Sequence, residues 1–180
     1  MTNPYDINAF KNPLFTVDSV LFTVKDDALK VLMVKRANEP FIGSWGLPGG
    51  FVDVDIDDST DLTALRKLKE KTSVAPQYLE QLRTFSGINR DPRGFSVTLV
   101  YFALVAEQDV SSHIDTVEDA QWVDIKQIAD LPVAFDHKHI IEPFAGCGHI
   151  VEYIVNYKAS VNYKASTAST SIIESYDIHP

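Results

Sequence analysis

The segment that most constrains the fold runs from Ala37 to Asp58 and reads ANEPFIGSWGLPGGFVDVDIDD. It is dense in glycine, proline and aspartate, which interrupt helices and the interiors of strands. This segment therefore cannot form a long helix or strand, and we expect a long loop that surrounds a short strand. A loop of this length inside a compact domain often carries function.

A hairpin of two strands is predicted before this loop. Residues 15–24 (FTVDSVLFTV) and 31–36 (VLMVKR) are rich in β-branched and aromatic side chains, which favour strands. Asp26 and Asp27 lie between them and supply the residues of a turn. The chain therefore enters the long loop from a strand.

A helix over residues 59–72 is predicted to follow the loop. Either Asp58 or Ser59 can accept hydrogen bonds from the free N–H groups of its first turn. From Leu62 onward, leucines recur at three-residue spacing, and this pattern predicts one apolar face.

The second half of the chain predicts strands at residues 82–85, 96–106 and 120–123, and helices that begin near Asp124 and Asp136. Pro143 is expected to interrupt the second of these helices, because proline lacks the N–H group that a helix interior needs. Strands mixed with two or three helices, without a strict alternation, indicate the α+β class.

The 180 residues, of which 45% are hydrophobic, suffice for one domain with a substantial core. The hexapeptide VNYKAS occurs twice in tandem, over residues 155–160 and 161–166, and two such short copies cannot form a stacked repeat. We therefore expect an N-terminal arm over residues 1–13, one domain over residues 14–143 and an atypical, weakly ordered tail over residues 144–180.

Charge and cysteine content exclude several functions. A net charge of -9 and a pI near 4.9 argue against DNA binding by this chain alone, because duplex binding draws on clustered Lys and Arg. Cys147 is the only cysteine, so an intrachain disulfide and a thiolate zinc site are excluded. The sequence also shows neither a secretory signal pattern nor an apolar run long enough to span a membrane. We expect a cytoplasmic protein.

One motif carries the chemistry. After WGLPG at residues 45–49, the chain reads GFVDVDIDDSTDLTALRKLKEKTSV from Gly50. The Nudix signature is a Gly, five residues, a Glu, seven residues, and then REUxEExGU, where U is a bulky aliphatic residue. Asp58 stands where the first Glu belongs, with two extra residues between it and Gly50. The signature is matched at Gly50, Arg66, Leu68, Glu70 and Val74.

The chain therefore resembles the Nudix family over approximately residues 14–143. The resemblance implies a Nudix fold, in which a mixed β-sheet is sandwiched between helices. In active members, glutamates aligned with Lys67, Glu70 and Lys71 hold divalent cations. Positions i, i+3 and i+4 share one helix face, and carboxylates there suit Mg²⁺, which prefers oxygen ligands.

Two lysines in this trio replace carboxylates by ammonium groups. Lys67 and Lys71 would repel the cation that the family motif attracts, so we expect no metal site and an impaired enzyme. If hydrolase activity survives, Mg²⁺ would be required. Asp58, Arg66 and Glu70 would then be the remaining motif residues, with Glu118 as a further catalytic carboxylate.

Further segments, among them VKRANEPFIGSWGLPGGFVD, NRDPRGFSVTLVY and LPVAFDH, resemble the Nudix-related transcriptional regulators of NAD metabolism and the ADP-ribose pyrophosphatases. In the regulators the Nudix domain senses ADP-ribose and a following winged-helix domain binds DNA, and no winged helix is recognisable here. The resemblance implies an ADP-ribose-type ligand and a possible homodimer. A weak Mg²⁺-dependent ADP-ribose pyrophosphatase and a scaffold without a nucleotide ligand stay open as alternatives.

Four residues are candidates for contacts with the diphosphate of such a ligand. Arg36 ends a strand and can pair with phosphate oxygens in a bidentate manner, or form a salt bridge at the strand edge. Arg93 offers a second such contact, or lies solvated in its loop. Gly49 and Gly50 permit close approach of the backbone to phosphate, although a tight turn would also explain them.

Four other residues are candidates for the remainder of the ligand site. Phe41 and Trp45 can stack on an adenine ring or pack in the core. Tyr101 either lines the pocket or is a buried core residue of its strand. His137 either senses the ligand or caps the helix at which it lies.

Overall fold

The computed structural model describes residues 10–112 and 114–145. Both copies of VNYKAS, Cys147 and most of the predicted arm and tail lie outside the described residues. The chain divides at Glu142 into two units, and the site lies in the first. The elements are β1 (Leu14–Lys25), β2 (Ala28–Arg36), β3 (Trp45–Gly46), β4 (Gly49–Phe51), α1 (Thr60–Thr72), β5 (Glu80–Gly87), β6 (Ser96–Leu104), β7 (Val117–Asp124), the 3-10 helix η2 (Ile125–Asp130) and α2 (His137–Ala145).

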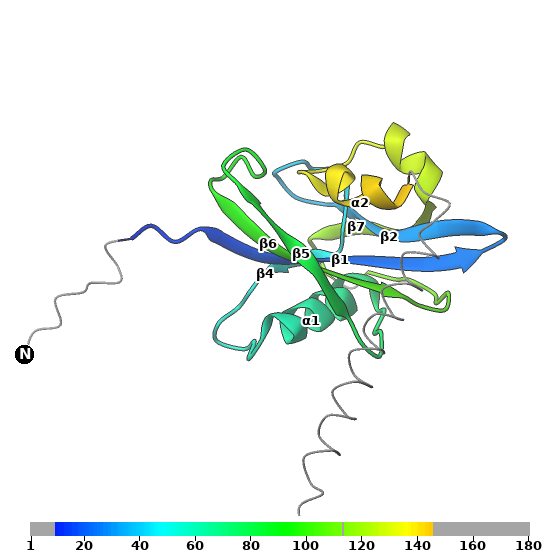
Figure 1. The fold of residues 1–180 in the computed structure, drawn as a ribbon, viewed down its shortest axis with the longest axis horizontal. Helices are drawn as coiled ribbons and strands as arrows, with labels where there is room; N and C mark the ends of the chain where they lie inside the picture. Colours follow the sequence, from blue (N-terminus) through cyan, green and yellow to red (C-terminus); the bar gives the residue numbers. More distant parts are fainter. Residues whose placement is uncertain (1–9, 113, 146–180) are drawn as a thin grey trace, which may run out of the picture. The chain divides into compact units, whose positions relative to one another are not determined.

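The strands form a mixed sheet in the order β3-β2-β1-β6-β5, with β4 paired to β1 and β7 paired to β2. The predicted hairpin of β1 and β2 is confirmed, and it is plain in Figure 1. Strand β1 runs parallel to β6, from Leu14 opposite Ser96 to Phe22 opposite Leu104, and the other pairings are antiparallel. This sheet with a few helices confirms the predicted α+β class.

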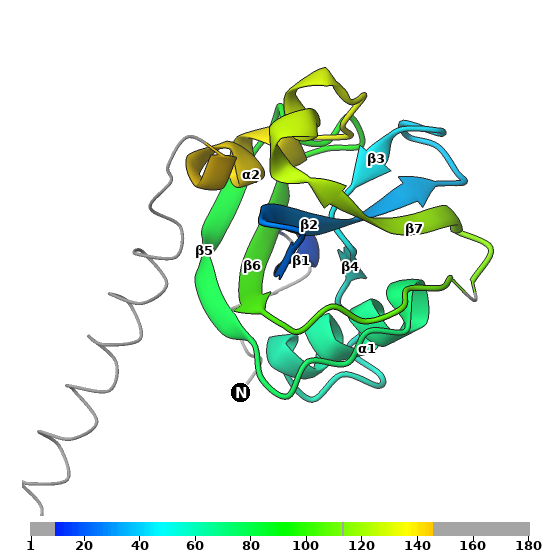
Figure 2. The same ribbon diagram turned by 90° about the vertical axis from the view of Figure 1, so that its right-hand side faces the viewer.

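Strand β1 is the centre of the sheet. Its residues from Val17 to Thr23 are all buried, because neighbouring strands and the layers on both faces cover it. Figure 2 shows α1 on one side of β1 and β6, and the beginning of α2 on the other side. The two faces of β1 therefore support two separate core layers.

Helix α1 begins as predicted, but its buried face includes only one of the three predicted leucines, Leu68. Ser59 is the N-cap, and its hydroxyl accepts a hydrogen bond from the N–H of Leu62. Leu62 itself is 49% exposed, so the predicted leucine face is wrong at its first position. The buried residues are Thr63, Ala64, Leu68 and Thr72. Thr63 and Ala64 are adjacent, and Ala64, Leu68 and Thr72 are four residues apart, a spacing closer to the helix period of 3.6 than three-residue spacing is.

Two further expectations need correction. The segment 124–130 forms a 3-10 helix, whose first N–H groups are capped by the Asp124 carboxylate, rather than an α-helix. Helix α2 continues through Pro143 instead of ending before it. The expected loop from residue 37 to residue 58 is confirmed, and it contains two short strands, β3 and β4, rather than one.

Candidate functional site

A cavity of about 410 Å³ opens where the WGLPGG loop, α1 and the loop after β5 approach one another. Its volume lies within the range of small-molecule sites, roughly 300–1,000 Å³. Eight charged side chains line its wall, and cations outnumber carboxylates. The cations are Arg36, Lys67, Lys71, Arg90 and Arg93, and the carboxylates are Asp18, Glu39 and Asp91.

Arg36 stands at the end of β2 and is held by its own loop. Its Nε donates to the carbonyl of Pro40 at 2.7 Å, and its Nη2 donates to the carbonyl of Asn38 at 3.4 Å. The guanidinium carbon lies 4.9 Å from the ring centroid of Phe135, a distance that suits a cation–π contact. Among the described residues no carboxylate forms an ion pair with Arg36, so its charge is available to an anionic ligand.

Arg93 is positioned by the acid two residues before it. Its Nε and Nη2 donate to the two Asp91 carboxylate oxygens at 3.0 and 2.7 Å. Burial alone would raise the pKa of Asp91, but the hydrogen bonds from Arg93 hold that pKa below its ordinary value. The guanidinium also lies 5.1 Å from the ring of Phe51 and 5.9 Å from that of Phe135. Asp91 therefore holds the guanidinium within reach of both aromatic rings.

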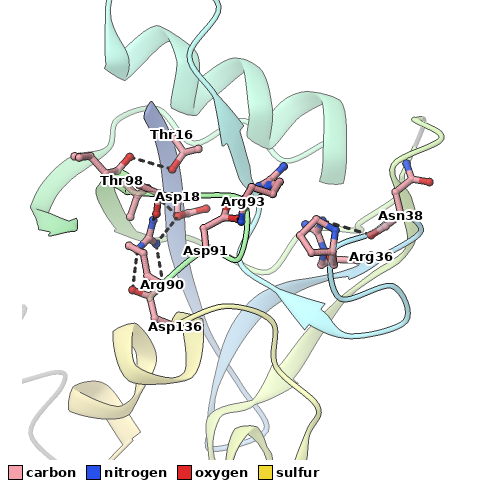
Figure 3. A network of polar contacts seen from close by, with 12 residues as sticks. Thr16, Asp18, Arg36, Asn38, Arg90, Asp91, Arg93, Thr98 and Asp136 are labelled. Carbon is pink, nitrogen blue, oxygen red and sulfur yellow. Dashed lines mark hydrogen bonds and ion pairs between the residues drawn. The ribbon is translucent and has the colours of Figure 1, made fainter. Parts of the chain in front are cut away.

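Arg90 links the floor of the cavity to the residue before α2. Its Nε and Nη2 bind the two oxygens of Asp136 at 2.9 and 2.8 Å, and its Nη1 donates to the hydroxyl of Ser96 at 3.0 Å. The carboxylate of Asp18 lies 3.9 Å from the same guanidinium. Figure 3 shows Arg90 between Asp18 and Asp136, with Asp91 and Arg93 between this network and Arg36.

His137 closes this network beneath the WGLPGG loop. Its Nδ1 accepts a hydrogen bond from the backbone N–H of Leu47 at 2.8 Å, and its Nε2 lies 3.6 Å from Asp18. Asp18 also accepts a hydrogen bond from Thr98 at 2.8 Å. Burial would raise the pKa of Asp18, but His137, Thr98 and Arg90 together lower it. Asp18 is therefore an ionised, buried acid.

Gly49 is required by this arrangement. A Cβ at Gly49 would collide with the backbone carbonyl of Val17 and with the carboxylate of Asp18. Only a residue without a side chain lets β4 approach β1 this closely. The close approach brings the Gly49–Gly50 backbone into the wall of the cavity.

Two ammonium groups complete the wall from α1. Lys67 and Lys71 both line the cavity. Burial lowers the pKa of Lys71 to about 8; Asp18 opposes this change, and the positive charges of Lys67 and Arg36 reinforce it. These mutually repelling cations favour an anion between them.

Similarity to known proteins identifies the family. The NUDIX domain profile matches residues 15–144. The chain belongs to the Nudix family. It is 40% identical over 138 residues to the ADPR responsive transcriptional repressor NtrR of Acinetobacter baylyi, covering 77% of this chain and 55% of the repressor. It is 32% identical over 135 residues to an ADP-ribose pyrophosphatase of Methanocaldococcus jannaschii, covering 75% of each chain.

Solved structures of Nudix proteins share the fold. The NUDIX domain of Shewanella oneidensis NrtR, in a complex with ADP ribose, is 51% identical, with a TM-score of 0.74, over 77% of this chain and 90% of that chain. A MutT/nudix protein of Enterococcus faecalis is 35% identical with a TM-score of 0.65, over 73% of this chain and 60% of that chain. The chain spans only about half the length of the repressor that it matches.

None of its described helices combines the length and hydropathy required to cross a membrane.

The donor set does not fit the divalent cations that active Nudix hydrolases hold. Glu70 is the one acid of the motif trio, and it lies 3.0 Å from Arg66 Nη1 and 3.6 Å from Lys67 Nζ. Within residues 10–112 and 114–145, no group of three or more His, Cys, Asp or Glu lies close enough to hold a metal ion. A carboxylate engaged by two cations is a poor ligand for Mg²⁺.

The acid that pairs with the motif arginine Arg66 is Asp57, and not the adjacent Asp58, which stands where the first glutamate of the signature belongs. Arg66 Nε and Nη2 bind the two Asp57 oxygens at 2.7 and 2.5 Å, and the Asp57 side chain is only 2% exposed. Asp58 is exposed. The hydrogen bonds from Arg66 hold the pKa of Asp57 far below its ordinary value. This pair fastens the end of the long loop to α1.

The structure brings five of the eight predicted ligand-binding residues into the cavity wall, namely Arg36, Gly49, Gly50, Arg93 and His137. Phe41 lies in a neighbouring hollow of about 350 Å³, where its ring meets that of Phe135 at a centroid distance of 4.9 Å. Phe41 is therefore beside the cavity, and not in its wall.

Three predicted residues lie elsewhere. The hydroxyl of Tyr101 contacts Asp61 at 2.5 Å and Thr60 at 2.7 Å under α1, so this buried tyrosine belongs to the core. Trp45 pairs with the strand β2 and bridges to Val133, outside the cavity wall. Glu118 forms an exposed ion pair with Lys35 at 2.7 Å and takes no part in the site.

Sequence reasoning missed Asp18, Arg90 and Asp136 as members of the site. A signal was present for Asp18, because an acid inside an otherwise apolar strand is rarely buried without partners. Arg90 and Asp136 gave no comparable signal. Their pairing joins residues 46 positions apart.

Proposed function

We propose that this chain is a cytoplasmic Nudix-fold sensor domain that binds ADP-ribose or a related nucleoside diphosphate sugar, with its catalytic helix degenerate. The observation that carries the proposal is the cavity itself, a cationic wall in a chain of net charge -9. A diphosphate needs convergent positive charge, and Arg36, Lys67 and Lys71 supply it. The NUDIX domain whose structure contains ADP ribose, at 51% identity, supports the same ligand class.

The chemistry of the wall matches the parts of such a ligand. Guanidinium groups bind phosphate oxygens with paired N–H donors, so Arg36 and Arg93 suit the diphosphate. The rings of Phe51 and Phe135 flank Arg93 and offer apolar surface to a base or a ribose. The main competing function, hydrolysis of the diphosphate, needs a metal-activated water, and the lysines of α1 oppose the metal.

We further propose that the sensing domain extends over residues 14–143 and acts as the ligand-responsive part of a regulator of NAD metabolism. Ligand binding would act by shifting a conformational equilibrium, which requires unequal affinity for two states. A homodimer is part of this proposal, because related families commonly dimerise and symmetric dimers are the commonest homo-oligomers. Direct DNA binding by this chain alone is not part of it, because a net charge of -9 opposes binding to a polyanion.

Calorimetric titration with ADP-ribose, paired with an assay for released AMP, tests the proposed function. We expect saturable binding of ADP-ribose, weaker binding of AMP, and no AMP release over hours in the presence of Mg²⁺. AMP release at enzymatic rates would show a pyrophosphatase instead. Neither binding nor release would indicate a scaffold and refute the sensor.

A further inference from the structure

Two lysines face the cavity from the helix that carries metal-binding glutamates in active Nudix hydrolases. Lys67 and Lys71 are four residues apart, so they lie one above the other on the same face of α1. Both are in the wall of the cavity that also contains Arg36 and the Gly49–Gly50 backbone. The ammonium groups of Lys67 and Lys71 therefore supply positive charge at the place where a metal ion supplies it in active Nudix hydrolases.

The position of Lys67 is set by the loop opposite it. Its Cε and Cδ lie 3.2 and 3.3 Å from the point where a Cβ would stand on Gly50, so the aliphatic part of the side chain covers that glycine. The Lys67 side chain is 20% exposed, and Glu70 lies 3.6 Å from its ammonium group. Lys67 is thus held against the glycine backbone, where a phosphate can approach both.

Lys71 lies one helical turn beyond Lys67 and lines the same cavity. Lys67 and Arg36 also line it, so three cations share this wall. An anion with several oxygens can bind the three positive groups together, and this arrangement relieves their mutual repulsion.

We propose that Lys67 and Lys71 bind the diphosphate of the ligand directly and take the place of divalent cations, so that nucleotide binding by this domain needs no metal. The inference rests on the proposed function and adds how the site holds its ligand. It also explains why the ligand stays intact. An ammonium group neutralises phosphate charge, but it does not coordinate a water molecule and lower its pKa as a divalent cation does.

The first experiment compares ADP-ribose binding by the parent protein in EDTA and in Mg²⁺. Lys67→Gln and Lys71→Gln are titrated beside it, with Lys69→Gln as the matched control, because Lys69 is an exposed lysine of the same helix. We expect the parent to bind equally in both buffers. Each cavity variant should bind about tenfold more weakly, as loss of one charged hydrogen-bond partner predicts, and Lys69→Gln should match the parent.

The second experiment reverses the charge. Lys67→Glu with Lys71→Glu places three carboxylates on one face of α1, together with Glu70. We expect this double variant to lose ADP-ribose binding in EDTA and to regain it in Mg²⁺ or Mn²⁺. Binding of Mn²⁺ alone, followed by electron paramagnetic resonance, gives a readout that does not depend on the nucleotide.

The outcomes separate the inference from the function on which it rests. If the parent binds ADP-ribose only with a metal, or if Lys67→Gln and Lys71→Gln bind as well as Lys69→Gln, the inference is wrong and the sensor proposal stands. If the parent binds no ADP-ribose in either buffer, the proposed function fails, and the inference fails with it. The comparison of ADP-ribose binding in EDTA and in Mg²⁺ uses the parent protein alone, so it does not require any variant to fold correctly.

Discussion

The backbone N–H of Leu47 donates a hydrogen bond to Nδ1 of His137 at 2.8 Å. Because Nδ1 is the acceptor, Nε2 carries a proton and faces Asp18 at 3.6 Å. His137 therefore joins the WGLPGG loop to β1. The buried histidine holds the floor of the cavity in place, and this finding favours a structural role over helix capping.

Replacement of His137 by Ala should destabilise the domain. The Leu47 N–H and the buried Asp18 carboxylate would each lose a partner, and an unpaired buried polar group costs about 1–3 kcal/mol. Urea unfolding monitored by tryptophan fluorescence measures the loss. His139→Ala is the control, because His139 is exposed on the same helix and its removal should change stability by less than about 0.5 kcal/mol. Equal losses in the two variants would refute the structural role of His137.

Replacement of Arg36 by Gln should weaken ADP-ribose binding without destabilising the fold. Its side chain donates only to loop carbonyls and contacts one ring, so its removal frees no buried carboxylate. We expect a loss of at least tenfold in affinity, since a charged hydrogen bond contributes about 1.5–3 kcal/mol. Arg83→Gln is the matched control. Arg83 also lies over a phenylalanine ring, at 4.6 Å from that of Phe85, but outside the cavity wall.

The affinity for ADP-ribose should fall as pH rises through about 8. Below the Lys71 pKa of about 8 the ammonium is charged before and after binding, and the affinity is independent of this group. Above it, the free protein has lost the proton, and a bound diphosphate, which favours the charged form, must draw a proton from solution. Calorimetric titration of the parent protein with ADP-ribose at several pH values between 7 and 10 measures how steeply the affinity falls with pH.

Lys71→Gln should abolish this part of the pH dependence. Titration at pH 8.5 in two buffers of different ionisation enthalpy should show proton uptake for the parent and for Lys69→Gln, and none for Lys71→Gln. If proton uptake on ADP-ribose binding is the same in all three proteins, a group other than Lys71 titrates.

Asp57 and Asp58 should differ sharply in their effect on stability. Asp57→Asn removes the bidentate acceptor of Arg66, whereas Asp58→Asn changes an exposed side chain. The urea midpoint at pH 7 should fall for Asp57→Asn and stay near the parent value for Asp58→Asn. A larger effect at Asp58 would contradict the pairing of Asp57 with Arg66.

The same pair predicts a pH dependence with a defined sign. The folded-state pKa of Asp57 is lowered, mainly by its hydrogen bonds to Arg66. The stabilisation is therefore present above the unfolded Asp pKa of about 3.9 and is lost as pH falls below it. The difference in unfolding free energy between parent and Asp57→Asn should be constant near neutral pH and shrink below about pH 4.

Local features of the chain were determined by the sequence alone. The hairpin before the loop, the Ser59 cap of α1 and the loop dense in glycine and proline each depend on residues close together in the chain. The same holds for the change of charge at Lys67 and Lys71, because helix periodicity fixes which residues of α1 share a face. These features sufficed to predict the family and the fold class.

The membership of the site was decided by the tertiary structure. Asp18 joins the cavity because β1 pairs in parallel with β6, which brings Thr98 to its carboxylate from 80 residues away. The same pairing places Tyr101 under α1, on the core side. In a strand, successive side chains point to opposite faces, so a change of one position in register reverses what a residue contacts.

The pairing of Asp57 rather than Asp58 with Arg66 has a similar cause. The path of an irregular loop decides which of two adjacent acids points at the helix, and no periodicity governs that path. Long-range pairing and loop geometry depend on the packing of the whole domain. Local sequence patterns therefore determined the elements and the charges, and the assembled sheet decided which of those charges meet.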